Sequence, residues 1–583
     1  MARTGLFRTL RKLMRTSRRA QRAGLSEREY LQRVAELPSR KPRRTFLKGS
    51  ALTLAASPIF QSLNMGQALA AGEESAKTQN VDGVLILGGG GAGLAAAFVL
   101  GRHGIPFTLV EGSQRLGGRI FTKDNFNDDG QFIEMGGELV DTGHSALFWL
   151  CEKLGLGVEK FSSEDASLGL AETLYKFNGQ LFDQEDILHG IRPLVKSVVK
   201  AQDEMYTLKN GDGFDGYLTY KSAGRLPLFP KYDKMTLKDF LCNVEVAPWI
   251  REAVDVAYLG EYGLATDEQS ALNLTELFDV DASDGFSMFG DSDEAYRVKN
   301  GSSEIPKAII QYLTGSQNPR RGQQKFKIGH MLNSIKSLSN GKLRCAFDGP
   351  SGGVEMIASH VICTIPFSTL RNVELKNLAM SAVKKKCIAE IGYGTNSKVM
   401  LGFKSTFWRD GNLIKPTPAS VGEFYGDFPS ANFWETSRLQ GDRNRRGILT
   451  NYLGGSEGLR AGLNVSGKED HGARNREQAL KDLNRIFGDI PKNQFTNRLA
   501  VANWSRISGG FQKGSYACLR PGQYGSIWGS AGEAELGGRL LFAGEHTSLD
   551  YQGYMNGAYD SGISAARQLI QAIQDGTKIS SAS

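Results

Sequence analysis

The chain has 583 residues and a net charge of +8 at pH 7. Its positive charge is concentrated in residues 1–48, which hold 15 Lys and Arg against 3 Asp and Glu and so carry +12, leaving −4 for the rest of the chain. An acidic body gives no reason to expect nucleic acid or an anionic membrane surface as a partner, and at roughly 510 residues it exceeds one ordinary domain.

Residues 1–71 are predicted to be a basic region followed by an export signal. The motif RRTFLK at 43–48 resembles the twin-arginine signal, an uncharged segment follows at 49–71, and Ala-Leu-Ala at 68–70 is a candidate cleavage site. The alternatives are a basic arm for nucleic acid or a membrane anchor, but the uncharged segment is too polar to make a good spanning helix. We therefore expect the twin-arginine translocase to export the folded protein to the periplasm or outside the cell, with its six cysteines as free thiols.

A buried strand and a glycine-rich turn follow this region. Residues 84–87 are all apolar, as in a parallel strand covered on both faces, and an alanine-rich helix is expected over 92–100. A second strand over 107–110 ends at Glu111, which lies 23 residues after the first glycine of the turn and could hold ribose hydroxyls. The alternative is an ordinary tight turn with a surface glutamate. The dinucleotide-binding turn is predicted to use Gly88, Gly90 and Gly93.

Further motifs resemble the flavin-containing amine oxidase family, which includes monoamine, polyamine and L-amino-acid oxidases. The stretches ILGGGGAGLAAAFVL, VEGSQRLGGRI and IEMGGELVD follow one another in the family's order, and residues 540–566 resemble its C-terminal signature. In that signature a strand ends at a glycine and an acid, and a later helix points its positive N-terminus at the flavin. The resemblance implies FAD as the cofactor. Besides the turn and Glu111, the residues implied to bind it are Gly117, Gly118, Arg119, Gly136, Gly137, Glu545 and Met555.

The resemblance implies an α/β fold in which a Rossmann-like FAD-binding domain is interleaved with a substrate domain of mixed sheet flanked by helices. The FAD-binding segments are expected at 80–150, 298–370 and 500–575. The substrate domain would comprise 151–297 and 371–499, with patterns typical of a helix over 381–391 and a strand over 398–403. Residues 576–583 are expected to form a flexible tail.

Lys398 is the first candidate catalytic residue. It lies in GTNSKVM, ten residues before Trp408, and matches the family lysine that hydrogen-bonds a water at flavin N5. A lysine between apolar neighbours on a strand is costly unless it has a partner. The alternative is a lysine at a sheet edge whose ammonium group reaches solvent.

Aromatic residues near the C-terminus are the next candidates. Tyr554, in GYMNG, matches one wall of the aromatic cage of monoamine oxidases, although a plain core tyrosine is the alternative. Trp504 and Tyr516 both fall in the region of the second wall, and Tyr516 needs a one-residue shift to take the position that Ser515 otherwise occupies. Where monoamine oxidases attach flavin through a cysteine this chain has a glycine, so FAD is predicted to be bound without a covalent link.

Asp141 aligns with a position where polyamine oxidases carry Glu or His facing the substrate channel. An acid there could pair with a distal ammonium or guanidinium group, and the alternative is an aspartate that caps the helix expected from His144 to Leu154. Leu139 stands where many L-amino-acid oxidases have a carboxylate-binding arginine. This difference favours amines over amino acids as substrates.

The implied activity is oxidation of an amine to an imine and then an aldehyde, with O2 as acceptor and release of hydrogen peroxide and ammonia or a smaller amine. The alternatives are an L-amino-acid oxidase, with basic amino acids among its candidate substrates, a carotenoid-type desaturase or isomerase, and a flavin-binding protein without turnover. No metal site is expected, because the seven histidines show no ligand spacing. A homodimer is one assembly that we consider.

Overall fold

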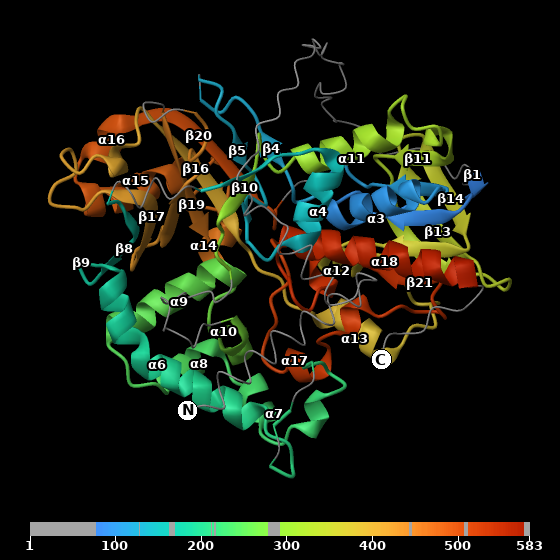
Figure 1. Cartoon of the computed structure of the whole chain (residues 1–583), viewed down its shortest axis with the longest axis horizontal. Coiled ribbons are helices and arrows are strands. Elements are labelled where there is room, and N and C mark those ends of the chain that lie inside the picture. The colour runs from blue at the N-terminus through green and yellow to red at the C-terminus, as the bar shows by residue number, and fades with distance from the viewer. Residues whose placement is uncertain are drawn as a thin grey trace, which may run out of the picture.

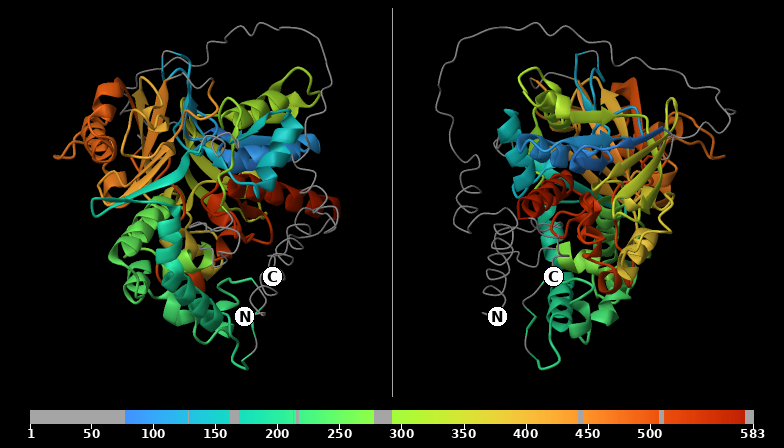
Figure 2. Two further views of the ribbon diagram at one scale, coloured as in Figure 1. Left: turned by 60° about the vertical axis from the view of Figure 1, so that its left-hand side comes forward. Right: turned by 90° about the vertical axis from the view of Figure 1, so that its right-hand side faces the viewer.

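A computed structural model describes residues 77–127, 129–161, 169–211, 213–214, 217–277, 292–441, 446–506 and 511–575. The predicted export signal and the predicted C-terminal tail lie outside these residues. The described chain forms a unit around a parallel sheet, a unit around a larger mixed sheet, and a group of helices next to both (Figures 1 and 2).

The parallel sheet brings together strands from distant parts of the chain. Every neighbouring pair in it is parallel, and the central strand is completely buried, as expected when both faces of a sheet are covered. This arrangement confirms the predicted Rossmann-like architecture. In spatial order its strands are β11 (Gln324–Lys327), β3 (Phe107–Val110), β2 (Val84–Leu87), β15 (His360–Cys363) and β21 (Leu540–Phe542).

Helices cover one face of this sheet and a second sheet covers the other. Val84 and Ile86 of β2 pack with the helices, whereas Leu85 and Leu87 pack with the second sheet, because successive strand residues point to opposite faces. The helices are α3 (Gly91–Arg102), α4 (Ser145–Leu154), α11 (Glu304–Thr314) and α18 (Met555–Asp575). The second sheet has the order β1 (Lys77–Asn80), β14 (Gly352–Ala358), β13 (Leu343–Gly349) and β12 (Met331–Ser337).

The first and last described helices of the FAD-binding unit lie side by side, α3 in blue and α18 in red in Figure 1. Their backbones approach closely because the contacting residues are small. A Cβ at Gly562 would come within 2.1 Å of the carbonyl oxygen of Ala92, so glycine is required there. Helices from near the two ends of the described chain, α3 and α18, therefore pack together in the helical layer on the parallel sheet.

The substrate unit is built on a seven-stranded mixed sheet. All its neighbouring strands are antiparallel except β17 and β8, which are parallel. Its order is β20 (Phe495–Asn503), β16 (Ser397–Phe403), β19 (Gly447–Leu453), β18 (Asn432–Glu435), β17 (Ser420–Gly426), β8 (Ala171–Phe177) and β9 (Gln180–Phe182). The helices of the same part of the chain are α6 (Gln184–Met205), α7 (Phe229–Asp233), α8 (Leu237–Cys242), α9 (Pro248–Tyr262), α10 (Ala271–Leu277), α14 (Gly455–Leu459), α15 (Ala473–Phe487) and α16 (Ile490–Gln494).

Short elements connect the two units. One three-stranded sheet joins strands from both sides of the predicted boundaries near 150 and 298, and β20 extends past the predicted boundary at 500, so the exact domain limits stay a prediction. These strands are β6 (Leu139–Val140), β10 (Tyr296–Val298) and β7 (Val158–Lys160). The remaining elements are β4 (Thr122–Lys123), β5 (Ile133–Glu134), α12 (Phe367–Leu370), α13 (Ala382–Glu390), α17 (Gln523–Ser526) and the 3₁₀ turns η1 (Ala223–Arg225), η2 (Arg321–Gln323), η3 (Phe407–Arg409), η4 (Ser530–Gly532) and η5 (Glu545–Thr547).

Candidate active site

A cavity of about 690 Å³ lies between the parallel sheet and the seven-stranded sheet. On one side it begins at the carboxyl ends of the parallel strands, where open α/β sheets bind their ligands. The residues at those ends are Leu87, Val110, Thr364 and Gly544. On the other side it is walled by the seven-stranded sheet, including Lys398, Val421, Tyr425, Trp434 and Tyr452.

The glycine-rich turn between β2 and α3 shows which glycines the protein itself requires. A Cβ at Gly93 would lie 2.0 Å from the carbonyl oxygen of Gly88, and Gly88 itself has φ +102°, so both are required by the turn. Gly90 differs, because a Cβ there would find only the Cα of Gly118, at 3.9 Å. Gly90 lines the cavity and precedes the N-terminus of α3. The space at Gly90 therefore fits a ligand phosphate at a helix N-terminus.

Glu111 follows β3 and lines the same end of the cavity. One carboxylate oxygen accepts a hydrogen bond from Gly89 N at 2.7 Å, and the other accepts from Ser113 N at 2.8 Å. Each oxygen keeps a further lone pair. Glu111 is thus held in place and can still accept hydroxyl groups, although its role with ribose stays a prediction.

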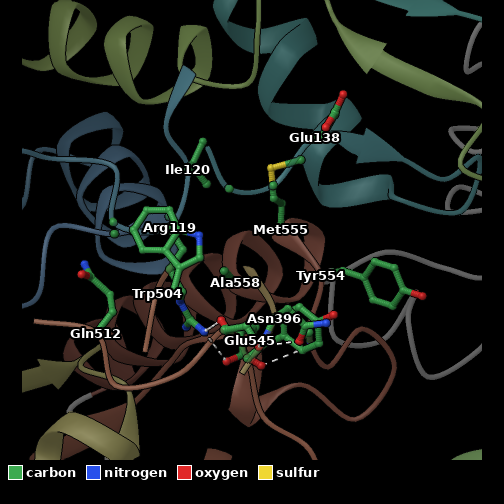
Figure 3. A pocket seen from close by; sticks show the side chains of 18 of the residues that line it. Arg119, Ile120, Glu138, Asn396, Trp504, Gln512, Glu545, Tyr554, Met555 and Ala558 are labelled. Carbon is green, nitrogen blue, oxygen red and sulfur yellow. Dashed lines mark hydrogen bonds and ion pairs between the residues drawn. The ribbon is translucent and has the colours of Figure 1, made fainter. Parts of the chain in front are cut away.

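Arg119 and Glu545 connect the N-terminal and C-terminal motifs across the cavity (Figure 3). Arg119 Nη1 lies 3.1 Å from Glu545 Oε1 and also donates to the backbone oxygen of Ser515. Glu545 accepts in addition from Gly553 N at 3.1 Å. This pair fixes the segment before Tyr554 against the GGR turn, in which Gly117 and Gly118 also line the cavity.

Gly136 and Gly137 line the cavity as well, but contacts within the protein already exclude side chains there. A Cβ at Gly136 would lie 1.8 Å from the backbone oxygen of Arg119, and one at Gly137 would lie 2.6 Å from Sδ of Met555. Met555 is the first residue of α18, as predicted, and lines the cavity with Ala558. The positive end of the helix dipole therefore faces the cavity.

Lys398 is buried on β16 and all three of its ammonium protons have partners. Its Nζ donates to the backbone oxygen of Gly136 at 2.8 Å and to that of Glu134 at 3.3 Å, and it forms an ion pair with Glu138 Oε2 at 2.8 Å. Burial alone would raise the pKa of Glu138, but Lys398 and Arg297 lower it below its usual value. Lys398 lines the cavity and is not a lysine at a sheet edge.

The three aromatic candidates all line the cavity, but in different places. The Tyr554 hydroxyl lies 3.2 Å from Glu261 Oε1 and 3.2 Å from Ser292 Oγ. Tyr516 shares a 3.0 Å hydrogen bond with the hydroxyl of Tyr452, and its ring is 3.4 Å from the position of a Cβ at Gly553, directly before Tyr554. Trp504 lies next to Arg119, across the pocket from Tyr554 in Figure 3. This placement favours Tyr516 as the second wall, whose role stays a prediction.

Asp141 does not line the cavity, contrary to the expectation that it faces the substrate channel. Its carboxylate accepts from Glu294 N at 2.9 Å and from Ser292 Oγ at 3.2 Å, and lies 3.2 Å from His144 Nε2. It does not cap α4 either, because His144 is the N-cap residue and no side chain caps that helix end. Asp141 does not reach the cavity because its carboxylate binds Ser292 and Glu294, and these two residues lie between it and the cavity.

The sequence analysis did not identify the acidic residues that line the cavity. Glu138 lies inside the motif IEMGGELVD. A buried lysine needs an acidic partner, so a search for the partner of Lys398 could have identified Glu138 from the sequence. Glu261 on α9, Glu294 before β10 and Glu423 on β17 also line the cavity. No motif marks these three, because they reach the cavity from unrelated segments.

The chain matches the model of the flavin-containing amine oxidoreductase family over residues 92–570 and therefore belongs to that family. It is 25% identical to an L-amino-acid oxidase of Siganus canaliculatus, over 83% of this chain and 85% of that protein. It is 24% identical to the flavin-containing amine oxidase A of Sus scrofa, over 84% and 85% of the two chains. A solved structure of wild-type putrescine oxidase bound to putrescine has the same fold, with a TM-score of 0.65 and 18% identity over 85% of this chain and 100% of that one.

Other features of the described residues concern metals, membranes and thiols. No group of three or more His, Cys, Asp or Glu in this part of the chain is arranged to hold a metal ion. None of its helices is long and apolar enough to cross a membrane. All six cysteines, which are described, are free thiols, and only Cys242 is exposed.

Proposed function

We propose that this enzyme oxidises the C–N bond of a small amine to an imine, with O2 as the final acceptor. The imine is hydrolysed to an aldehyde, and hydrogen peroxide and ammonia or a smaller amine are released. The observation that supports this function best is the continuity of the cavity. It runs from the space at Gly90, which fits a phosphate, to the buried Lys398 and the tyrosines at 516 and 554.

The side chains have distinct roles in this proposal. Bound FAD would supply the acceptor for the hydride that leaves the substrate carbon. Tyr554 and Tyr516 would hold the amine between their rings, and the surrounding burial excludes water. Lys398, fixed by Glu138 and Gly136, would exchange its longest contact, at 3.3 Å with the backbone oxygen of Glu134, for a water at the reacting end of the cavity. The N-terminus of α18 favours negative charge there.

FAD is proposed to be bound without a covalent link to cysteine. None of the described residues that line the cavity is a cysteine. Cys518 is completely buried and accepts a 3.5 Å hydrogen bond from Asn273 Nδ2, outside the cavity wall. Acid precipitation of the protein should therefore release the flavin into the supernatant.

An L-amino-acid oxidase is the second candidate, and one observation favours it. Arg438 lines the cavity, lies 4.2 Å from the ring centroid of Phe161, and is a group that could bind a substrate carboxylate. The family match leaves the desaturase alternative without support. A binding protein without turnover is the remaining alternative, and measurement of flavin reduction tests it.

We expect amines, and not α-amino acids, to bleach the flavin absorbance when oxygen is excluded. The measurement uses a panel of alkylamines, diamines and L-amino acids, followed by admission of air and assay of peroxide. Bleaching by amino acids alone would establish the second candidate. A flavin that no compound reduces would contradict an enzymatic function.

We also propose export through the twin-arginine translocase, which the motif at 43–48 supports. Replacement of both arginines, Arg43→Lys and Arg44→Lys, should leave precursor with bound FAD in the cytoplasm, because that pathway requires the pair. Cell fractionation with a flavin assay measures this result. An unchanged amount of exported protein would contradict the proposal.

A further inference from the structure

Tyr554 lines the part of the cavity that we call the substrate end, and its hydroxyl begins a line of polar groups that leads out of the cavity wall. This hydroxyl lies 3.2 Å from Ser292 Oγ, which in turn donates to Asp141 Oδ1 at 3.2 Å. Glu261 Oε1 is a second acceptor for the Tyr554 hydroxyl, also at 3.2 Å. Ser292 and Glu261 line the cavity with Tyr554, whereas Asp141 lies behind them.

The other carboxylate oxygen of Asp141 faces a histidine. Asp141 Oδ2 lies 3.2 Å from His144 Nε2, and His144 Nδ1 accepts a hydrogen bond from the backbone N of Asp141 at 3.0 Å. Because Nδ1 is an acceptor, the proton of the neutral ring lies on Nε2, on the side of the carboxylate. Asp141 therefore orients the imidazole with its backbone and with its side chain. His144 is 1% exposed and does not line the cavity.

His144 leads back to Tyr554 and closes a circuit. The imidazole packs edge-on against the ring of Tyr554, with centroids 5.2 Å apart and an angle of 62° between the rings. This geometry is one in which aromatic pairs attract each other. Ser292 thus contacts Tyr554 at its hydroxyl, His144 contacts it at its ring, and Asp141 joins the two. We call Ser292, Asp141 and His144 the support of Tyr554.

The two chain segments that carry the support are bound to each other. Asp141 Oδ1 also accepts from Glu294 N at 2.9 Å, and Thr142 N donates to Asp293 Oδ1 at 2.8 Å. On the other side of His144, the ring of Tyr551 packs edge-on against the imidazole, with centroids 5.6 Å apart. Neither Ser292 nor His144 can therefore shift without breaking contacts that hold its neighbours.

Tyr554 needs such contacts because little in its own segment fixes its side chain. The residue before it, Gly553, has φ +87° and no side chain, and a tyrosine side chain rotates about two bonds. In a reaction that depends on alignment, a misplacement of about 1 Å can cost on the order of 10²-fold in rate. The orientation of Tyr554 is thus set from behind the cavity wall.

We propose that Asp141 and His144 are positioning residues, which hold Tyr554 in the orientation in which it aligns the substrate. They act through the tyrosine and do not line the cavity themselves. The proposal rests on the proposed amine oxidase function, because that function gives Tyr554 its role with the amine.

Two variants remove different parts of the support. Asp141→Asn can keep the oxygen that accepts from Ser292 and Glu294, but it then places an N–H group opposite His144 Nε2, where two donors face each other. His144→Leu removes the ring that packs on Tyr554 and keeps an apolar side chain in its place. Asp267→Asn is the matched control, at an exposed aspartate 3.7 Å from Lys238 and outside the cavity wall.

The first measurement observes the Tyr554 ring in holoenzyme labelled with 3-fluorotyrosine. The fluorine NMR signal that is lost in Tyr554→Phe belongs to this ring. A half turn of the fluorinated ring moves the fluorine between two environments, so the signal reports how fast the ring rotates. Rotation should be slow in the wild type and in Asp267→Asn. It should be fast enough to broaden or merge the signal in Asp141→Asn and His144→Leu.

The second measurement is stopped-flow flavin reduction by the alkylamines and diamines of the panel. Asp141→Asn and His144→Leu should each lower the limiting rate by about 10- to 100-fold, with FAD content as in the wild type and Asp267→Asn unchanged. The loss should fall on this rate and not on substrate affinity, because alignment is what changes. A purely structural role would lower the free energy of unfolding and leave the rate of the folded enzyme unchanged.

Ser292→Ala tests the contact at the hydroxyl, and it keeps the proposal testable if His144→Leu does not fold. It should slow flavin reduction in the wild-type background. In a Tyr554→Phe background it should cause a further loss of less than about twofold, because the hydroxyl that Ser292 contacts is already absent. An equal loss in both backgrounds would overturn this part of the support.

The remaining outcomes separate this proposal from the one on which it rests. An unchanged Tyr554 signal in Asp141→Asn and His144→Leu would overturn the positioning role and leave the amine oxidase standing. A ring that rotates freely in these variants, with wild-type rates of flavin reduction, would overturn it as well. A flavin that no amine reduces would overturn the amine oxidase function, and the fluorine signal would still decide whether the support holds the ring.

Discussion

Gly90→Val should give a folded protein that lacks flavin. The Cβ would meet only the Cα of Gly118 at 3.9 Å, so the turn has room for it, and the valine methyl groups would extend into the space where the phosphates are expected. The purified variant should be colourless at visible wavelengths. Its far-ultraviolet circular dichroism should match that of wild-type protein from which FAD has been removed.

Gly224→Val is the matched control, because a Cβ at Gly224 also has open space and lies outside the cavity wall. This variant should keep its full flavin absorbance. Gly93→Ala should behave differently from both, since its Cβ would lie 2.0 Å from the oxygen of Gly88 and the turn itself would be disrupted. A yellow Gly90→Val protein would show that the diphosphate lies elsewhere.

Lys398→Met should have two separable effects, one on the rate and one on stability. If Lys398 holds the water at the reacting end, its loss should slow flavin reduction or reoxidation by about 10²- to 10⁴-fold. The substitution also leaves Glu138 buried without its cation, and loss of one partner of a buried ion pair costs about 3–5 kcal/mol. Stopped-flow measurement of both half-reactions and denaturant unfolding would give the two numbers.

The double variant Lys398→Met with Glu138→Gln separates the two effects. Removal of the acid's charge should restore most of the free energy of unfolding, because no uncompensated carboxylate is then buried. It should not restore the rate. Recovery of the rate together with stability would mean that Lys398 has only a structural role, and wild-type rates in the single variant would remove it from the mechanism.

The sequence predicted those parts of the fold whose local chemistry leaves a pattern. The apolar run of β2 and the glycines after it are required by backbone geometry at that point, so they are visible without tertiary information. The helices at 145–154 and 382–390 also leave a local pattern, and the second begins at a side-chain cap, in which Ser381 Oγ accepts a hydrogen bond from Lys384 N. Such features depend on neighbours in the chain.

The acids at the substrate end could not be predicted in that way. Glu261 and Glu423 are separated by more than a hundred residues and meet only because α9 packs beside the seven-stranded sheet. Asp141 was recognised as important, but its orientation depends on the turn before β10, which no local pattern specifies. A resemblance gives positions along the chain and not the direction of a side chain.

The packing of α18 on α3 has a consequence for biogenesis. α18 supplies Met555 and Ala558 to the cavity, whereas the turn at Gly90 belongs to a segment that is made hundreds of residues earlier. Neither the dinucleotide site nor the substrate cavity is therefore complete on a nascent chain. A cofactor held between these two segments can be enclosed only once both have been made and packed together.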